Sequence, residues 1–143
     1  MNTKNIIVGL VLITSLLVSP TKVIAEPREI VIEIPKTIPQ LISYYSEKYK
    51  VSEDLVIDIM DCETAGTFNP TMQSTVKYNF SSSKRGIVKG TQERSYGLSQ
   101  IHLPDHPEVS YEQATDAEFS IDFLTKNIAN GKASMWSCYK LVK

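Results

Sequence analysis

Apolar residues recur at helical spacing in three segments of the chain, which predicts three amphipathic helices. The first helix is expected from Gln40 to Tyr49, with an apolar face made of Leu41, Ile42, Tyr45 and Tyr49. The second is expected to begin after Ser52, a residue type that caps helix N-termini, and to stop near Gly66. Its apolar face consists of Leu55, Val56, Ile59 and Met60.

The third predicted helix has the clearest boundaries. The string Thr-Asp-Ala-Glu at 115–118 matches a capping box, and Asn130-Gly131 matches a helix exit. Its apolar face consists of Phe119, Phe123, Leu124 and Ile128. Upstream, a weaker helical pattern covers residues 96–101, and Pro104 and Pro107 end it.

Two other segments do not follow the helical period. Residues 26–39 carry three prolines around an alternating stretch at 30–34, which predicts an extended lead-in with one edge strand. Residues 71–94 contain a turn-like Ser-Ser-Ser-Lys-Arg-Gly cluster, which predicts a β-hairpin or a long loop. The expected fold is therefore mainly α, with one small β excursion and a single domain over residues 40–143.

The N-terminus has the pattern of a secretory signal peptide. Lys4 precedes the mostly apolar run Ile6–Val18, and the small-residue exit ends at Ala25. The run is shorter than the roughly 20 apolar residues of a transmembrane helix, so we expect cleavage after residue 25. This predicts an exported protein of the periplasm or the extracellular space, without stable membrane insertion.

The charge balance narrows the range of partners. Removing residues 1–25 takes Lys plus Arg from 15 to 13 against 16 Asp plus Glu, which changes the formal net charge from −1 to −3. Such a chain lacks the basic excess of a general nucleic-acid-binding protein. We expect the mature protein to be a monomer.

The mature chain retains two cysteines, Cys62 and Cys138. In an oxidising compartment their simplest interpretation is a structural disulfide, and a reactive thiol at Cys62 is the alternative. A zinc site needs more ligands than two cysteines. His102 and His106 have helical spacing, but Pro104 between them predicts a loop, so we expect no metal and no cofactor.

Glu63 is the strongest candidate for chemistry. It continues the buried face of the second helix, four residues after Ile59, and it lies near the C-terminal end, where the helix dipole opposes negative charge. Both features should raise the pKa of its carboxyl group. Asp61 is about 200° away around the helix and should point elsewhere, while Glu93, Asp105 and Glu112 are further carboxylates whose placement the sequence leaves open.

Three strings follow in order: Glu-Thr at 63–64, Phe-Asn-Pro at 68–70 with Ser74, and Gly-Leu-Ser-Gln-Ile at 97–101. Here the chain resembles the soluble-lytic-type lytic transglycosylases of the lysozyme-like superfamily. That family has a catalytic Glu followed by Ser, an aromatic-Asn-Pro segment ending in Ser, and a Gly-Leu-Met-Gln-Ile helix start. Thr64 replaces the usual Ser and Ser99 the usual Met.

The resemblance implies a lysozyme-like domain with a deep glycan cleft and a role for each matching residue. Glu63 takes the position of the catalytic acid, and Ser74 matches a serine that hydrogen-bonds near it. Gln100 matches a glutamine that lines the cleft, and Gly97 would allow close approach of the backbone to sugar. Tyr139 is the only tyrosine placed to face the acid, although the family string around it is missing.

The implied reaction is cleavage of the β-1,4 bond between N-acetylmuramic acid and N-acetylglucosamine in peptidoglycan, leaving a 1,6-anhydromuramyl end. A goose-type lysozyme-like hydrolase of the same bond and a non-catalytic glycan-binding or assembly protein are the alternatives. Small members of the family often serve secretion or conjugation machinery, which is a further possible partner. Aromatic candidates for stacking on sugar are Tyr78, Tyr96 and Trp136, although a lone tryptophan more often belongs to a core.

Overall fold

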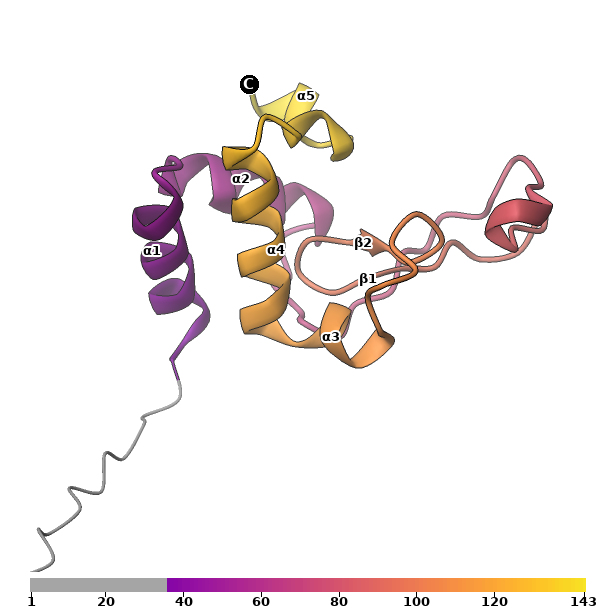
Figure 1. Cartoon of the computed structure of the whole chain (residues 1–143), viewed down its shortest axis with the longest axis horizontal. Helices are drawn as coiled ribbons and strands as arrows, with labels where there is room; N and C mark the ends of the chain where they lie inside the picture. Colours follow the sequence, from indigo (N-terminus) through magenta and orange to yellow (C-terminus); the bar gives the residue numbers. More distant parts are fainter. Residues whose placement is uncertain (1–35) are drawn as a thin grey trace, which may run out of the picture. The chain divides into compact units, whose positions relative to one another are not determined.

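Helices and one two-stranded sheet make up residues 36–143, the part of the chain that the computed structural model describes (Figure 1). The α-helices are α1 (Ile38–Tyr49), α2 (Glu53–Glu63), α3 (Tyr111–Thr115), α4 (Ala117–Ala129) and α5 (Tyr139–Val142). The remaining elements are the 3₁₀ turns η1 (Ser83–Arg85) and η2 (Ala133–Met135) and the antiparallel strands β1 (Ser95–Tyr96) and β2 (Ile101–His102).

The predicted mainly α class is confirmed for these residues. The signal peptide at 1–25 and the edge strand at 30–34 lie outside the described residues. Within residues 36–143, every helix is too short or too polar to span a bilayer.

The first two helices begin where capping chemistry places them. α1 starts at Ile38, two residues earlier than expected, because Pro39 occupies the first turn, where a missing N–H costs nothing. The backbone N–H of Thr37 donates to Gln40 Oε1 at 2.8 Å, which closes the N-terminus. The expected cap at Ser52 is confirmed: its hydroxyl oxygen accepts from the N–H of Leu55 at 3.4 Å.

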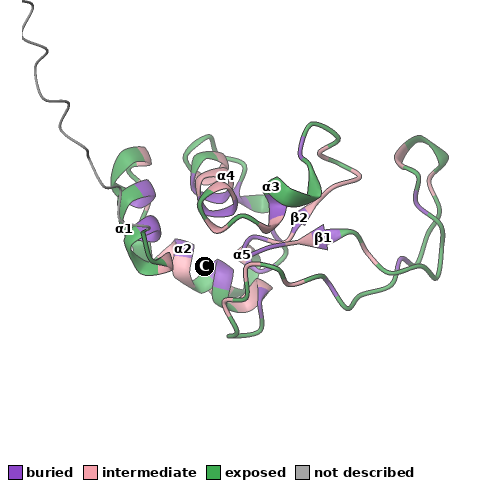
Figure 2. Cartoon of the chain, turned by 90° about the horizontal axis from the view of Figure 1, so that it is seen from below, coloured by how far each residue is buried: buried purple, intermediate pink, exposed green. Residues whose placement is uncertain are grey.

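The core lies between α1, α2 and α4, and the buried side of α1 faces the other two helices (Figure 2). Its fully buried members include Val56, Ile59 and Met60, as the apolar pattern predicts. On α4 the four predicted apolar residues all pack on the core, Leu124 fully buried and Phe119, Phe123 and Ile128 partly so. The pattern missed Ile121, which is also fully buried.

The predicted capping box at 115–118 is wrong, because two helices meet there. Thr115 ends α3, and its hydroxyl donates to the carbonyl of Tyr111 at 2.8 Å. Asp116 caps α4 through Oδ1, which accepts from the N–H of Phe119 at 2.8 Å. Glu118 does not complete a box: its carboxylate accepts from the Tyr45 hydroxyl at 2.9 Å and so joins α4 to α1.

The weak helix expected at 96–101 is also wrong, and so is the helix start that the resemblance implies there. Ser95 pairs with His102 and Tyr96 with Ile101, so the intervening residues form a tight hairpin turn. Two left-handed residues, Gly97 (φ 79°) and Gln100 (φ 46°), make this turn incompatible with a helix. Three buried residues of the turn region, Leu98, Ser99 and Ile101, anchor it to the helices.

The expected hairpin or long loop is found at 75–94, which extends away from the helices as an arm (Figures 1 and 2). Its two sides run antiparallel, with isolated bridges Lys77↔Gln92 and Ser82↔Ile87, and η1 lies near its tip. The arm carries Tyr78 and Ile87 inward and leaves Val76, Phe80 and Val88 exposed.

Candidate active site

Glu63 lies in a cavity of about 890 Å³ that is walled by the end of α2, the arm, the sheet and the segment around Trp136. It is the last residue of α2, as the sequence predicts, and its side chain is partly buried. The cavity has the size of a small-molecule site and contains both apolar and titratable groups.

The backbone immediately after Glu63 ends the helix sharply. The N–H of Gly66 donates to the carbonyl of Asp61 at 2.8 Å, and the N–H of Ala65 donates to that of Cys62 at 3.3 Å. This is a Schellman motif, in which Ala65 takes the left-handed conformation with φ 49°. The predicted stop at Gly66 is therefore part of the cap, and the helix itself ends three residues earlier. Thr64 is fully buried and donates its hydroxyl to the carbonyl of Met60 at 2.7 Å, which fixes the residue next to the acid.

The pKa of Glu63 is raised, and burial is the largest cause because it removes water from the charged form. Hydrogen bonds from the backbone N–H of Cys138 and the side chain of Ser137 act in the opposite direction, while the negative charge of Glu93 raises the pKa further. The direction predicted from the sequence is thus confirmed. With a raised pKa, the carboxyl group keeps its proton to higher pH than an unperturbed glutamate, which suits it to donate that proton.

The two cysteines form a disulfide next to Glu63. Cys62 and Cys138 are joined across 76 residues of sequence, with their Cα atoms 5.9 Å apart. Each partner neighbours the acid: Cys62 precedes Glu63 in α2, and the N–H of Cys138 donates to Glu63 Oε1 at 3.3 Å. The bond therefore holds one cavity wall against the candidate acid.

Two of the four predicted substrate-binding residues line the cavity, Ser74 and Gln100. The amide of Gln100 donates to the Gly97 carbonyl at 2.9 Å and to that of Met72 at 3.3 Å. The Ser74 hydroxyl donates to Glu93 Oε2 at 3.0 Å, so the carboxylate it holds in this structure is Glu93.

Gly97 and Tyr139 lie outside the cavity lining. Tyr139 packs at the margin of the main core, at the start of α5. The empty side of Gly97 faces protein, since an added Cβ would lie 1.8 Å from the Ala114 carbonyl oxygen. The glycine therefore permits close backbone contact with α3, where the resemblance suggested contact with sugar.

We expect Gly97→Ala to destabilise the protein by about 3 kcal/mol, combining the cost of a left-handed residue with overpacking against backbone. Gly90→Ala is the matched control, because Gly90 has φ 85° and no atom within 4 Å of the added Cβ. Urea unfolding of both variants measures the difference. Equal losses would show that the contact with Ala114 is not a constraint.

Ser99 is also part of the framework. It is fully buried, and its hydroxyl lies 2.8 Å from that of Ser120 on α4. Its carbonyl accepts from Trp136 Nε1 at 2.6 Å. Ser99 therefore makes a polar contact between the turn and α4. Trp136 is buried in the core, as expected for a lone tryptophan, and it also belongs to the cavity lining.

Sequence reasoning named Tyr78 but missed the two apolar arm residues beside it, Val76 and Phe80. Val76, Tyr78 and Phe80 all line the cavity, and Phe80 is 41% exposed. The signal was their alternation, which places every second side chain of an extended segment on one face. Tyr78 is mostly buried, while Tyr96 packs edge-on against Tyr111 with ring centroids 5.0 Å apart and is not part of the lining.

The carboxylates whose placement the sequence left open are now located. Glu93 and Asp105 line the cavity, whereas Glu112 is exposed on α3. His102 is the last residue of β2, and His106 follows the turn at residues 103–105, so the two histidines do not share a helix, as Pro104 predicted. His102 Nδ1 lies 2.8 Å from Asp105 Oδ2, and its Nε2 lies 2.9 Å from the Tyr78 hydroxyl. Residues 36–143 contain no group of three or more His, Cys, Asp or Glu side chains arranged to hold a metal ion.

No family model matches this chain, and neither a curated protein nor a solved structure matches it.

Proposed function

We propose that the protein cleaves the glycan strands of peptidoglycan, with Glu63 as the catalytic acid. The observation that carries the proposal is the position of Glu63, which is partly buried in a cavity of about 890 Å³ and has a raised pKa. The order of the strings around Glu63, Ser74 and Gln100 supports the lysozyme-like, lytic transglycosylase assignment. The disulfide fits an exported protein that acts in the periplasm or outside the cell.

In the proposed reaction Glu63 donates its proton to the oxygen that links N-acetylmuramic acid to N-acetylglucosamine. The bond from the muramyl C1 to this oxygen breaks, and the substrate's N-acetyl group assists at C1. Glu63, now a carboxylate, accepts the proton of the muramyl 6-hydroxyl as that oxygen bonds to C1. The product is a 1,6-anhydromuramyl end, and no water is consumed.

Features of the cavity fit a sugar chain. Phe80 presents an exposed aromatic ring at the arm, and the flat faces of sugars pack on such rings. Polar groups at Gln100, Ser74 and Ser137 lie in the same lining and supply hydrogen-bonding partners for hydroxyl and acetamido groups. Secretion or conjugation machinery is a further possible partner, because such machinery needs a local opening in the wall and this cleavage would provide one.

Mass spectrometry of the products from purified peptidoglycan tests the proposal. The wild-type protein lacking residues 1–25 should release muropeptides with 1,6-anhydromuramyl ends. Reducing muramic ends would instead show hydrolysis, the goose-type lysozyme alternative. An intact wall that nevertheless retains bound protein would show the non-catalytic alternative, a glycan-binding protein.

A further inference from the structure

A second carboxylate, Glu93, faces the same cavity as Glu63 from a different part of the chain. Glu63 ends α2, whereas Glu93 lies where the arm returns to β1, and both belong to the lining. The side chain of Glu93 is 29% exposed, so it is open to the cavity while largely enclosed by protein.

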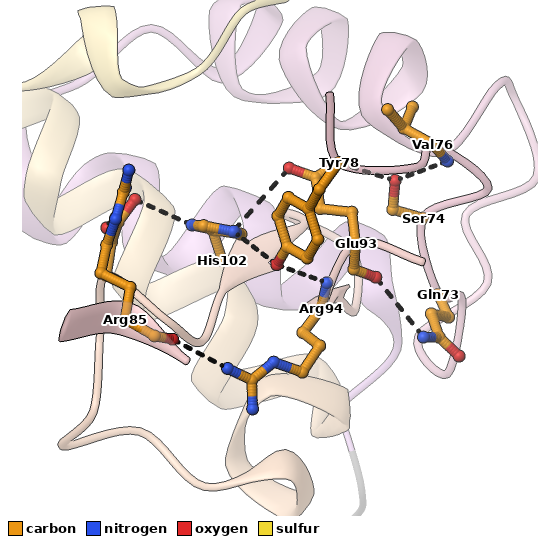
Figure 3. Close-up of polar contacts among 9 residues, drawn as sticks. Gln73, Ser74, Val76, Tyr78, Arg85, Glu93, Arg94 and His102 are labelled. Atoms are coloured by element: carbon orange, nitrogen blue, oxygen red, sulfur yellow. Dashed lines mark hydrogen bonds and ion pairs between the residues drawn. The ribbon is translucent and has the colours of Figure 1, made fainter. Parts of the chain in front are cut away.

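The Ser74 hydroxyl holds the Glu93 carboxylate from one side, and the His102 ring lies on the other side, beyond hydrogen-bond distance (Figure 3). The Ser74 hydroxyl donates to Oε2 at 3.0 Å, and His102 Nε2 lies 3.9 Å from Oε1. The backbone of Glu93 is fixed as well, because its N–H donates to the carbonyl of Val76 at 2.8 Å. Its orientation is therefore determined by the surrounding residues before any ligand binds.

His102 is itself held in place by further contacts (Figure 3). The N–H of Arg94 donates to the Tyr78 oxygen at 3.0 Å, which leaves the Tyr78 proton available for His102 Nε2 at 2.9 Å. The proton on Nδ1 then points to Asp105, whose other oxygen accepts from Arg85 at 2.7 Å. Burial raises the pKa of Asp105, but the hydrogen bonds from Arg85 and His102 outweigh it, so the net pKa is lowered and Asp105 stays charged.

The two cavity carboxylates have different surroundings, which suits them to different tasks. Glu63 is enclosed at a helix end and has a raised pKa, partly because of the negative charge on Glu93. Glu93 faces a hydroxyl, an imidazole and the Arg85–Asp105 pair beyond them. Many glycoside-cleaving sites contain two such carboxyl groups, a protonated one that acts as the acid and a charged one that acts as base, nucleophile or electrostatic stabiliser.

We propose that Glu93 is a second catalytic residue, whose carboxylate stabilises the positive charge that develops at the muramyl C1 and N-acetyl group as the glycosidic bond breaks. The inference rests on the proposed glycan cleavage and adds a role that Glu63 cannot perform. As Glu63 transfers its proton and the C1–O bond breaks, the electron pair leaves with the oxygen. The sugar becomes cationic, and Glu93 remains an anion beside it without changing its own bonds. Attack by the 6-hydroxyl then removes the charge.

Glu93→Gln tests this role, because glutamine keeps the shape and can still accept from Ser74 while it removes the charge. We expect kcat for cleavage of purified peptidoglycan to fall about 100-fold, the scale for losing one group that stabilises transition-state charge. Binding of the variant to wall fragments should stay near the wild-type level. The decline of activity with rising pH, which follows the deprotonation of Glu63 and is called here the pH limb, should move to lower pH. The reason is that the variant lacks the negative charge that raises the pKa of Glu63. Glu47→Gln is the matched control, an equal change at an exposed position on α1.

The outcomes separate this inference from the proposed function. If the wild type releases muropeptides and Glu93→Gln matches Glu47→Gln in rate, the role of Glu93 is overturned while glycan cleavage stands. A slow Glu93→Gln with an unchanged pH limb and a lowered unfolding midpoint would assign Glu93 a purely structural role and likewise overturn it. A wild-type protein without cleavage activity would overturn both.

Discussion

A Glu63→Gln variant should lose wall-cleaving activity by on the order of 10³-fold, because the amide has no proton to donate to the glycosidic oxygen. The change is conservative in shape, and the amide oxygen can still accept from the Cys138 N–H that Glu63 binds at 3.3 Å. Loss of turbidity of purified peptidoglycan, compared for wild type and variant, measures the effect. Equal rates would remove Glu63 from the mechanism.

The stability of the same variant provides an independent check on Glu63. Its pKa is raised in the folded protein, so the folded state binds this proton more tightly than the unfolded state does. The resulting contribution to stability is fully present below the unfolded pKa of about 4.3 and is lost as pH rises through the folded pKa. At neutral pH the buried charge therefore destabilises the fold, and Glu63→Gln should unfold at equal or higher urea concentration than wild type.

The cleavage activity should depend on the protonation of the same Glu63 carboxyl group. The protonated form of Glu63 is the donor, so kcat/KM should decline as pH rises through the raised pKa. A decline centred near pH 4.3, the value of an unperturbed Glu, would contradict the burial that we describe.

Replacing Cys62 and Cys138 together by serine should lower the free energy of unfolding by about 4.5 kcal/mol. The chain-entropy relation gives this value for a bond that closes 76 residues of sequence, and native strain would reduce it. The same variant should also lose activity, because the Cys138 N–H that binds Glu63 is then held only by its own segment. Urea unfolding and turbidity assays measure the two effects.

Thiol reduction of the wild type is the control for the cysteine variant. Reduced wild type should approach the double variant in unfolding midpoint, and the double variant itself should not respond to reductant. An intact mass showing two free thiols in the unreduced protein would rule out the bond and, with it, this prediction.

Local patterns predicted the helical framework. The apolar period and the Ser52 cap placed α2, and the same period placed Glu63 at its buried C-terminal end. These features depend on residues only a few positions apart, so the sequence states them directly. The errors occurred where the surrounding structure overrides local preference. At 115–118, α3 ends at Thr115 and the N-cap of α4 is Asp116, so Glu118 is not at the capping-box position. At 97–101, the left-handed Gly97 and Gln100 form a turn in which Gly97 packs against Ala114.

The candidate site divides in the same way. The sequence by itself determined that Glu63 is a candidate acid on the buried face of its helix, and that the chain has two cysteines suited to pairing. Tertiary structure decided that the Cys62–Cys138 bond adjoins Glu63, that Ser74 binds Glu93, and that the arm brings a second carboxylate and Phe80 to the same cavity. The physical reason is distance along the chain: Glu63, Glu93 and Cys138 meet only because the packing of α2, the sheet and the C-terminal segment closes long loops, and no local pattern encodes that closure.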